Sequence, residues 1–147
     1  MKNIAVGIDF SELAEPVLEH AAELAKALGA HLYLVHIYAP EPDFVGYAEY
    51  AYPGVDEREE ELREEKNKIR EWIDALKDRG VDASGYMREG DTVLGLLEFA
   101  EKREVNMLVI GTHGRGIVER LLLGSVAEGI IRHATLPVVV VPREKGK

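Results

Sequence analysis

Two short segments of this chain consist almost wholly of apolar residues. They are NMLVIG, residues 106–111, and LPVVVVP, residues 136–142. Successive side chains of a strand point to opposite faces of its sheet, so a strand that is apolar throughout must be covered on both faces. Such strands are typical of parallel sheets enclosed by helices on both sides. This feature predicts an α/β fold.

The rest of the chain alternates strand-like and helix-like segments. Apolar runs at residues 3–8 and 31–38, and a weaker one at 81–87, indicate three further strands. Five strands alternating with four helices predict a doubly wound five-stranded parallel sheet with helices on both faces, a Rossmann-like fold. A ligand is expected beyond the carboxyl ends of its strands, where the winding direction reverses. Apolar side chains at steps of three and four residues predict the helices, at 14–28, 56–79, 93–100 and 125–134.

Residues at the ends of these segments predict how they start and stop. Ser11 is expected to cap the first helix, and Asp91 or Thr92 the third, because their side chains accept bonds from the free amides of a first turn. Gly29 suits the left-handed position that ends a helix. Gly85 weakens the 81–87 strand and favours a place near the edge of the sheet.

A long connection separates the second strand from the second helix. Residues 39–55 hold three prolines and two glycines, which disfavours regular structure. Three interpretations of its aromatic residues stay open: a lid over a ligand, a contact with another subunit, or disorder. The aromatic residues of this region are Tyr38, Phe44, Tyr47, Tyr50 and Tyr52.

Length and composition limit the possible functions. A chain of 147 residues has the usual size of one domain, and we expect residues 1–147 to form a single domain. Its formal charge of −9 makes binding to nucleic acid or to an anionic membrane unfavourable. It contains no cysteine, which excludes disulfides and thiol chemistry. With no apolar run long enough to span a membrane, we expect a cytoplasmic protein.

The segment GTHGRGIVERLLLGS, residues 111–125, contains the glycine pattern G-x2-G-x9-G-S. It has no lysine before its serine, so it is not a Walker A loop. Glycines still let backbone N–H groups approach a phosphate, and Gly124-Ser125 opens a helix whose amides favour an anion. From spacing alone, phosphate binding and a purely structural turn stay equally open.

Two longer segments show a family resemblance. GTHGRGIVERLLLGSVAEGIIRHATLPVVVVP and NIAVGIDFSELAEPVLEHAAELA are similar to the C-terminal and N-terminal hallmarks of the universal stress proteins. The resemblance covers nearly the whole chain. It implies an adenine nucleotide alpha hydrolase-like fold, the ATP-binding branch of the family, and ATP and Mg as ligands.

The resemblance also implies roles for individual residues. Asp9 would lie near the ribose or the magnesium ion, and Ile37 near the adenine. Ala127 stands where the family often has a hydroxyl, so one phosphate or metal contact is in doubt. The complete set expected to bind the nucleotide is Gly7, Ile8, Asp9, Ile37, Ile110, Gly111, His113, Gly114, Arg115, Gly124, Ser125 and Val126.

Several of these side chains have simpler interpretations. Asp9 could serve only to start the first helix. His113 has no serine or carboxylate close in sequence to complete a proton relay, so we expect no catalytic residue. The other histidines lack metal-ligand spacing, and His36 is expected to be a packed interior residue. Arg115, Arg120 and Arg132 could neutralise a phosphate or lie on an exposed helix face; the exposed face is at least as favoured for Arg132, and Arg115 is the better candidate for a phosphate.

Three functions remain compatible with the sequence. The first is a regulatory stress-response protein that binds Mg-ATP, acts on an unknown protein partner as a nucleotide-dependent switch, and hydrolyses ATP slowly if at all. The second is a slow ATP-hydrolysing or adenylyl-transferring enzyme, and the third a nucleotide-free interaction module. The resemblance further implies a homodimer through the last strand, Pro137 to Val141.

Overall fold

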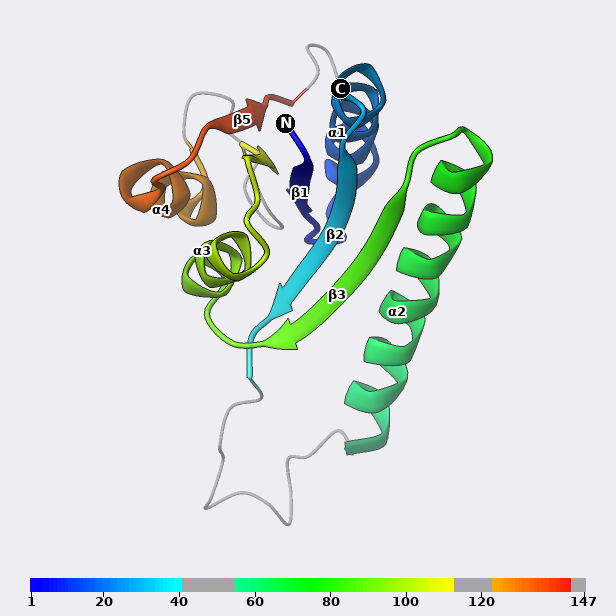
Figure 1. The fold of residues 1–147 in the computed structure, drawn as a ribbon. Helices are drawn as coiled ribbons and strands as arrows, with labels where there is room; N and C mark the ends of the chain where they lie inside the picture. Colours follow the sequence, from blue (N-terminus) through cyan, green and yellow to red (C-terminus); the bar gives the residue numbers. More distant parts are fainter. Residues whose placement is uncertain (41–54, 113–122, 144–147) are drawn as a thin grey trace.

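The strands form one parallel five-stranded sheet in the computed structural model, which describes residues 1–40, 55–112 and 123–143 (Figure 1). Their order is β3-β2-β1-β4-β5, so the chain winds from β1 first to one edge and then to the other. The strands are β1 (Asn3–Gly7), β2 (His31–Tyr38), β3 (Ala83–Glu89), β4 (Met107–Gly111) and β5 (Val138–Val141). The helices are α1 (Ala14–Leu28), α2 (Val55–Asp78), α3 (Thr92–Lys102) and α4 (Ser125–His133).

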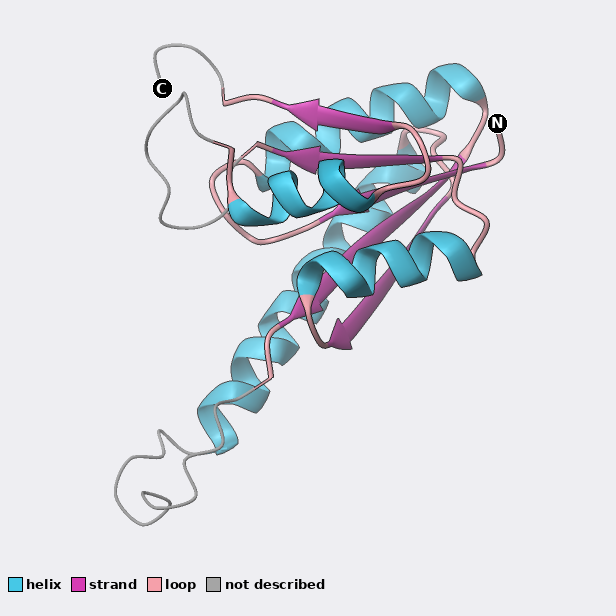
Figure 2. Ribbon diagram, turned by 90° about the vertical axis from the view of Figure 1, so that its left-hand side faces the viewer, coloured by secondary structure: helices cyan, strands magenta, loops and turns pink. Residues whose placement is uncertain are grey.

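Helices cover both faces of the sheet, as the sequence predicts (Figure 2). Residues alternate between the faces along each strand. In β1, Ile4 and Val6 pack with α1 and α2, whereas Ala5 packs with α3 and α4. In β2, Leu34 joins the first cluster and Val35 the second. The doubly wound α/β fold is therefore confirmed. In the described ranges, no helix has the length and apolarity needed to cross a bilayer.

The start of α1 differs from the prediction. Leu13 occupies the N-cap position with no side-chain capping bond, so Ser11 is not the helix cap. The Ser11 hydroxyl instead accepts a bond from the N–H of Leu13 at 3.2 Å, inside a turn that precedes the helix. That turn begins at Phe10, whose positive φ of 57° redirects the chain before a helix can form. The other two caps are confirmed: Gly29 ends α1 in the left-handed conformation, and Asp91 caps α3.

The third strand lies two residues later than the predicted range 81–87. Gly80, at φ 80°, turns the chain sharply after α2, and the N–H of Val81 donates back to the carbonyl of Leu76. Residues 81 and 82 are therefore used to leave the helix, and pairing with β2 starts at Ala83. The strand does lie at an edge of the sheet, and β5 forms the opposite edge.

The long helix α2 extends past the carboxyl ends of β2 and β3 (Figures 1 and 2). Its second half packs on the sheet through Ile69 and Leu76, with Trp72 half-buried beside them. Its first turns project beyond the strands, on the side where a ligand site of this fold is expected. Part of α2 is thus placed to form a wall of that site.

Candidate functional site

A cavity of about 700 Å3 opens at the carboxyl ends of β1, β2 and β4. β1 lies between β2 and β4, which is the point where the winding of the sheet reverses. The first turns of α2, α3 and α4 close its sides. Its size falls within the usual range for small-molecule sites.

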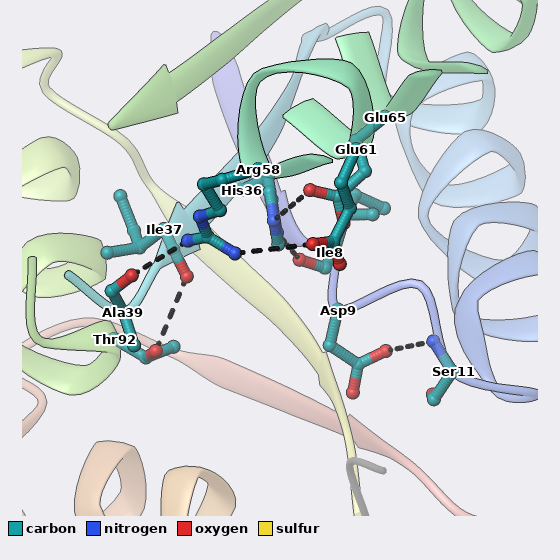
Figure 3. Close-up of polar contacts among 10 residues, drawn as sticks. All are labelled: Ile8, Asp9, Ser11, His36, Ile37, Ala39, Arg58, Glu61, Glu65 and Thr92. Carbon is teal, nitrogen blue, oxygen red and sulfur yellow. Dashed lines mark hydrogen bonds and ion pairs between the residues drawn. The ribbon is translucent and has the colours of Figure 1, made fainter. Parts of the chain in front are cut away.

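The end of β1 supplies the floor of the cavity through Gly7, Ile8 and Asp9. Gly7 allows close packing, because an added Cβ would lie 3.3 Å from a methyl group of Leu96. Asp9 is exposed to the cavity, and its Oδ1 accepts a bond from the N–H of Ser11 at 2.9 Å (Figure 3). The carboxylate thus stabilises the turn before α1 and has its second oxygen turned away from that bond.

The opposite wall is formed where β4 ends and α4 begins. Gly111 ends β4 and Thr112 follows it, and the N–H of Gly124 donates to the carbonyl of Thr112 at 2.7 Å. α4 starts at Ser125 with no side-chain cap. Amides in the first turn of a helix have no carbonyl one turn earlier to bind, and the positive end of the helix dipole lies there. The cavity therefore faces a helix N-terminus suited to an anion.

The end of β2 is packed tightly against α3. Ile37 is buried, and its carbonyl accepts a long bond of 3.4 Å from the hydroxyl of Thr92. Gly95 permits this packing, because a Cβ there would lie 2.9 Å from Cγ2 of Ile37. Both Ile37 and Thr92 line the cavity, so this packing fixes the shape of its wall.

Helix α2 contributes three charged residues that the sequence analysis did not assign to the site: Arg58, Glu61 and Glu65 (Figure 3). The Arg58 guanidinium donates to the carbonyl of Ala39 at 2.8 Å, lies over the ring of Tyr38, and pairs with Glu61 at 3.6 Å. Arg58 is the one lysine or arginine among the described residues that line the cavity.

A buried histidine connects α2 to the end of β1. His36 is 7% exposed, and its Nδ1 lies 2.7 Å from the carbonyl oxygen of Ile8. Its Nε2 lies 3.6 Å from a carboxylate oxygen of Glu65. The expectation that His36 is a packed interior residue is confirmed, although it also lines the cavity.

Comparison with known proteins decides the family. The model of the universal stress protein family matches residues 1–142. This chain belongs to the universal stress protein family. Universal stress protein MJ0531 of Methanocaldococcus jannaschii is 35% identical over 98% of this chain and 84% of its own length. A universal stress protein of Thermus aquaticus is 30% identical over 95% of this chain and 98% of its own.

Solved structures of other universal stress proteins share the fold. That of MJ0577 from Methanocaldococcus jannaschii has a TM-score of 0.80 at 29% identity, covering 99% of this chain and 98% of the other. A universal stress protein in complex with cAMP has a TM-score of 0.69 at 25% identity, covering 96% of each chain. One from Archaeoglobus fulgidus in complex with dAMP has a TM-score of 0.68 at 25%, covering 96% and 98%. Structural relatives in this family therefore bind adenine nucleotides.

Most of the residues assigned to the nucleotide from sequence lie together in this universal stress protein. Three of them, His113, Gly114 and Arg115, fall outside the described residues, as do the aromatic residues expected at 44–52. The remaining nine all line the cavity: Gly7, Ile8, Asp9, Ile37, Ile110, Gly111, Gly124, Ser125 and Val126. What each of them binds stays a prediction.

The simpler interpretations are also settled in part. Arg132 lies on an exposed face of α4, which is the simpler of its two interpretations, and its guanidinium pairs with Glu128. Asp9 does stabilise the turn before α1, so its structural role is real and leaves the ligand role open. Within the described ranges, no three histidine or acidic residues gather as a metal site. Near the expected phosphates the cavity is lined by one carboxylate residue, Asp9, and by two hydroxyl residues, Thr112 and Ser125, which fits magnesium held largely by the nucleotide.

Proposed function

We propose that this universal stress protein binds Mg-ATP in the cavity and acts as a nucleotide-dependent regulatory switch in a stress response. The observation that carries the proposal is the uncapped N-terminus of α4, which faces a cavity at the winding reversal of the sheet. The cAMP and dAMP complexes of family members add support, because they share this fold. The proposal therefore assigns the chain to the ATP-binding branch.

The parts of the nucleotide are assigned by the chemistry of each wall. The phosphates would bind the first-turn amides of α4 and the hydroxyl of Ser125, because both are donors at the positive end of a helix. Asp9 would accept from the ribose or hold magnesium between itself and the phosphates. The adenine would pack against Ile37. His113, Gly114 and Arg115 would complete the phosphate loop.

Hydrolysis is proposed to be slow or absent. Fast phosphoryl transfer needs a held metal, a placed nucleophile and extra positive charge in the transition state. The residue before Ser125 is glycine instead of the lysine of a Walker A loop. A regulatory role then follows from linkage: a nucleotide that binds one conformation more tightly shifts the protein toward that conformation.

Calorimetric titration of nucleotide-free protein with Mg-ATP tests the binding. Heat with one site per chain, accompanied by a rise in melting temperature, is the expected result. No heat and no melting shift at millimolar Mg-ATP would overturn it and favour the nucleotide-free interaction module. Single-turnover assays separate the enzyme alternative, because release of ADP or AMP near one per second is incompatible with a stable switch.

Three further properties belong to this proposal. The chain would form a homodimer by pairing β5, an edge strand whose residues Val138 to Val140 are half-buried, with its copy. Residues 1–147 would fold as a single domain, in agreement with a family match that covers residues 1–142. The protein would work in the cytoplasm. A chain without cysteine forms no disulfides, so it is suited to that reducing compartment.

A further inference from the structure

His36 has no assigned contact with the proposed nucleotide, yet it is the one buried polar or charged residue among those that the structure describes. Its Nδ1 lies 2.7 Å from the carbonyl oxygen of Ile8. A carbonyl oxygen can only accept, so Nδ1 carries the hydrogen and donates it. This bond ties β2 to the residue immediately before Asp9.

The histidine ring is itself held on two sides. Its Nε2 faces Glu65, whose side chain is only 12% exposed, across 3.6 Å from α2 (Figure 3). Phe10 packs edge-on against the ring, with the ring centres 4.8 Å apart. His36 therefore contacts both residues that flank Asp9 in the sequence, Ile8 through its carbonyl and Phe10 through its ring.

Phe10 has a backbone conformation that needs such support. Its φ of 57° is left-handed, a region that bulky side chains avoid because the Cβ crowds the backbone. Its ring contacts those of both His36 and Trp72, with the Trp72 ring stacked at 5.7 Å between centres. Strained residues of this kind persist where surrounding contacts hold them, and they are frequent at ligand sites.

We propose that His36 is a positioning residue for the nucleotide site, which fixes the direction of Asp9 by holding Ile8 and Phe10 on either side of it. This inference rests on the proposed function, because the direction of Asp9 matters only if Asp9 contacts the bound nucleotide or its magnesium ion. It also makes a physical connection: Trp72, the only tryptophan of the chain, stacks on the same Phe10. A shift of the Asp9 turn therefore changes the surroundings of Trp72.

Three variants and two measurements test the inference. His36→Ala removes the bond to Ile8 and the support of Phe10, whereas His36→Asn keeps an N–H donor at the position of Nδ1. His31→Ala is the matched control, because His31 begins the same strand at its far end and bonds Asp82 and Ser84 there. Calorimetry with Mg-ATP gives the Kd, and Trp72 emission without nucleotide reports the turn.

The expected results separate positioning from general stability. His36→Ala raises the Kd about tenfold, because the Asp9 turn must then be ordered when the nucleotide binds, and shifts Trp72 emission. His36→Asn restores most of the affinity. His31→Ala lowers the melting temperature and leaves both the Kd and the emission unchanged.

A fourth variant covers the case in which His36→Ala does not fold. Phe10→Gly accepts the left-handed conformation without strain but loses the ring, so the turn becomes loose and affinity falls several-fold. If the wild type binds Mg-ATP and His36→Ala has the same Kd, the positioning role alone is overturned. If His36→Ala is unfolded, an unchanged Kd in Phe10→Gly has the same meaning. Wild-type protein that binds no adenine nucleotide would overturn the proposed function and this inference with it.

Discussion

Gly124 donates its backbone N–H to the carbonyl oxygen of Thr112 at 2.7 Å, and this bond joins the end of β4 to the start of α4. The next residue, Ser125, is the first of the helix. The first N–H groups of a helix have no partner within the helix itself. The two ends of the glycine-rich segment are therefore held together at the point where the first turn of the helix faces the cavity.

Replacing Ser125 with proline tests whether these amides bind the phosphates. Proline fits the first position of a helix, and Gly124, at φ −65° and ψ 160°, already has the extended conformation that a residue before proline requires. The helix is thus expected to survive while one amide donor is lost. Ser125→Ala, which removes only the hydroxyl, is the control. We expect calorimetry to give a Kd for Mg-ATP roughly tenfold higher in the proline variant than in the alanine variant. Equal affinities would contradict phosphate binding by this amide.

Asp9→Asn separates the ligand role of Asp9 from its structural role. The asparagine oxygen can still accept the bond from the N–H of Ser11, so the turn before α1 is kept. The negative charge that would hold magnesium is removed. We expect an unchanged melting temperature and a Kd for Mg-ATP raised about tenfold. Asp9→Ala loses both the turn bond and the charge, so its melting temperature should also fall. If Asp9→Asn bound Mg-ATP like wild type, the role of Asp9 would be structural only.

Gly95→Ala tests the packing that shapes the cavity wall. A methyl group there would lie 2.9 Å from Cγ2 of Ile37, so α3 or Ile37 must move. Overpacking of this kind costs about 1–3 kcal/mol of unfolding free energy. Gly85→Ala is matched in crowding, since its methyl group would lie 2.7 Å from Cγ2 of Ile69 on the other face of the sheet. Chemical denaturation should show a lower free energy of unfolding in both variants, whereas calorimetry should show weaker nucleotide binding in Gly95→Ala alone.

The sequence predicts the layered fold well because hydrophobic patterning determines it. The apolar strands 106–111 and 136–142 need cover on both faces, and the observed β4 and β5 lie within these ranges. The ends of elements are harder to predict when a turn competes with a cap. Ser11 has the side chain of an N-cap, yet the left-handed Phe10 places it in a turn outside the helix. Phenylalanine has no local preference for that conformation. The contacts that accompany it are with His36 and Trp72, which lie far from Phe10 in the sequence.

The wall formed by α2 was missed although the sequence carries a signal for it. Arg58, Glu61 and Glu65 continue the buried stripe of Ile69 and Leu76 toward the N-terminus at the same steps of three and four residues. Charged residues on the buried stripe of a helix indicate that the helix extends beyond the sheet, over a polar space. How far it extends depends on where β2 and β3 end, which the local sequence of α2 does not encode.

Glu19 and Arg79 predict a pH dependence of stability. The bonds donated by Arg79 at 2.6 and 2.8 Å hold the pKa of Glu19 below its ordinary value. A lowered carboxyl pKa stabilises the fold above the pKa of the unfolded state, and this stability is lost as pH falls through the native value. We therefore expect Glu19→Gln to be less stable than wild type at neutral pH, with the difference shrinking as the pH falls below the ordinary glutamate pKa of about 4.3.

Denaturation from pH 3 to 7 measures this difference. The same series in 1 M salt is its control, because salt screens an exposed ion pair and should reduce the difference at neutral pH. A difference that persists unchanged at pH 3 would show that glutamine disturbs packing instead of removing the ion pair.

Val139→Lys tests the proposed homodimer. Val139 lies in the middle of β5, the edge strand proposed to pair with its copy. Two lysines brought together across the dimer axis would repel each other and lose apolar burial, so the dissociation constant should rise at least tenfold. Leu94→Lys is the control, because it places the same charge on an apolar residue of α3 that is already 57% exposed. Sedimentation equilibrium should show weaker association in Val139→Lys alone. Equal association of the two variants and wild type would place the dimer contact on another surface.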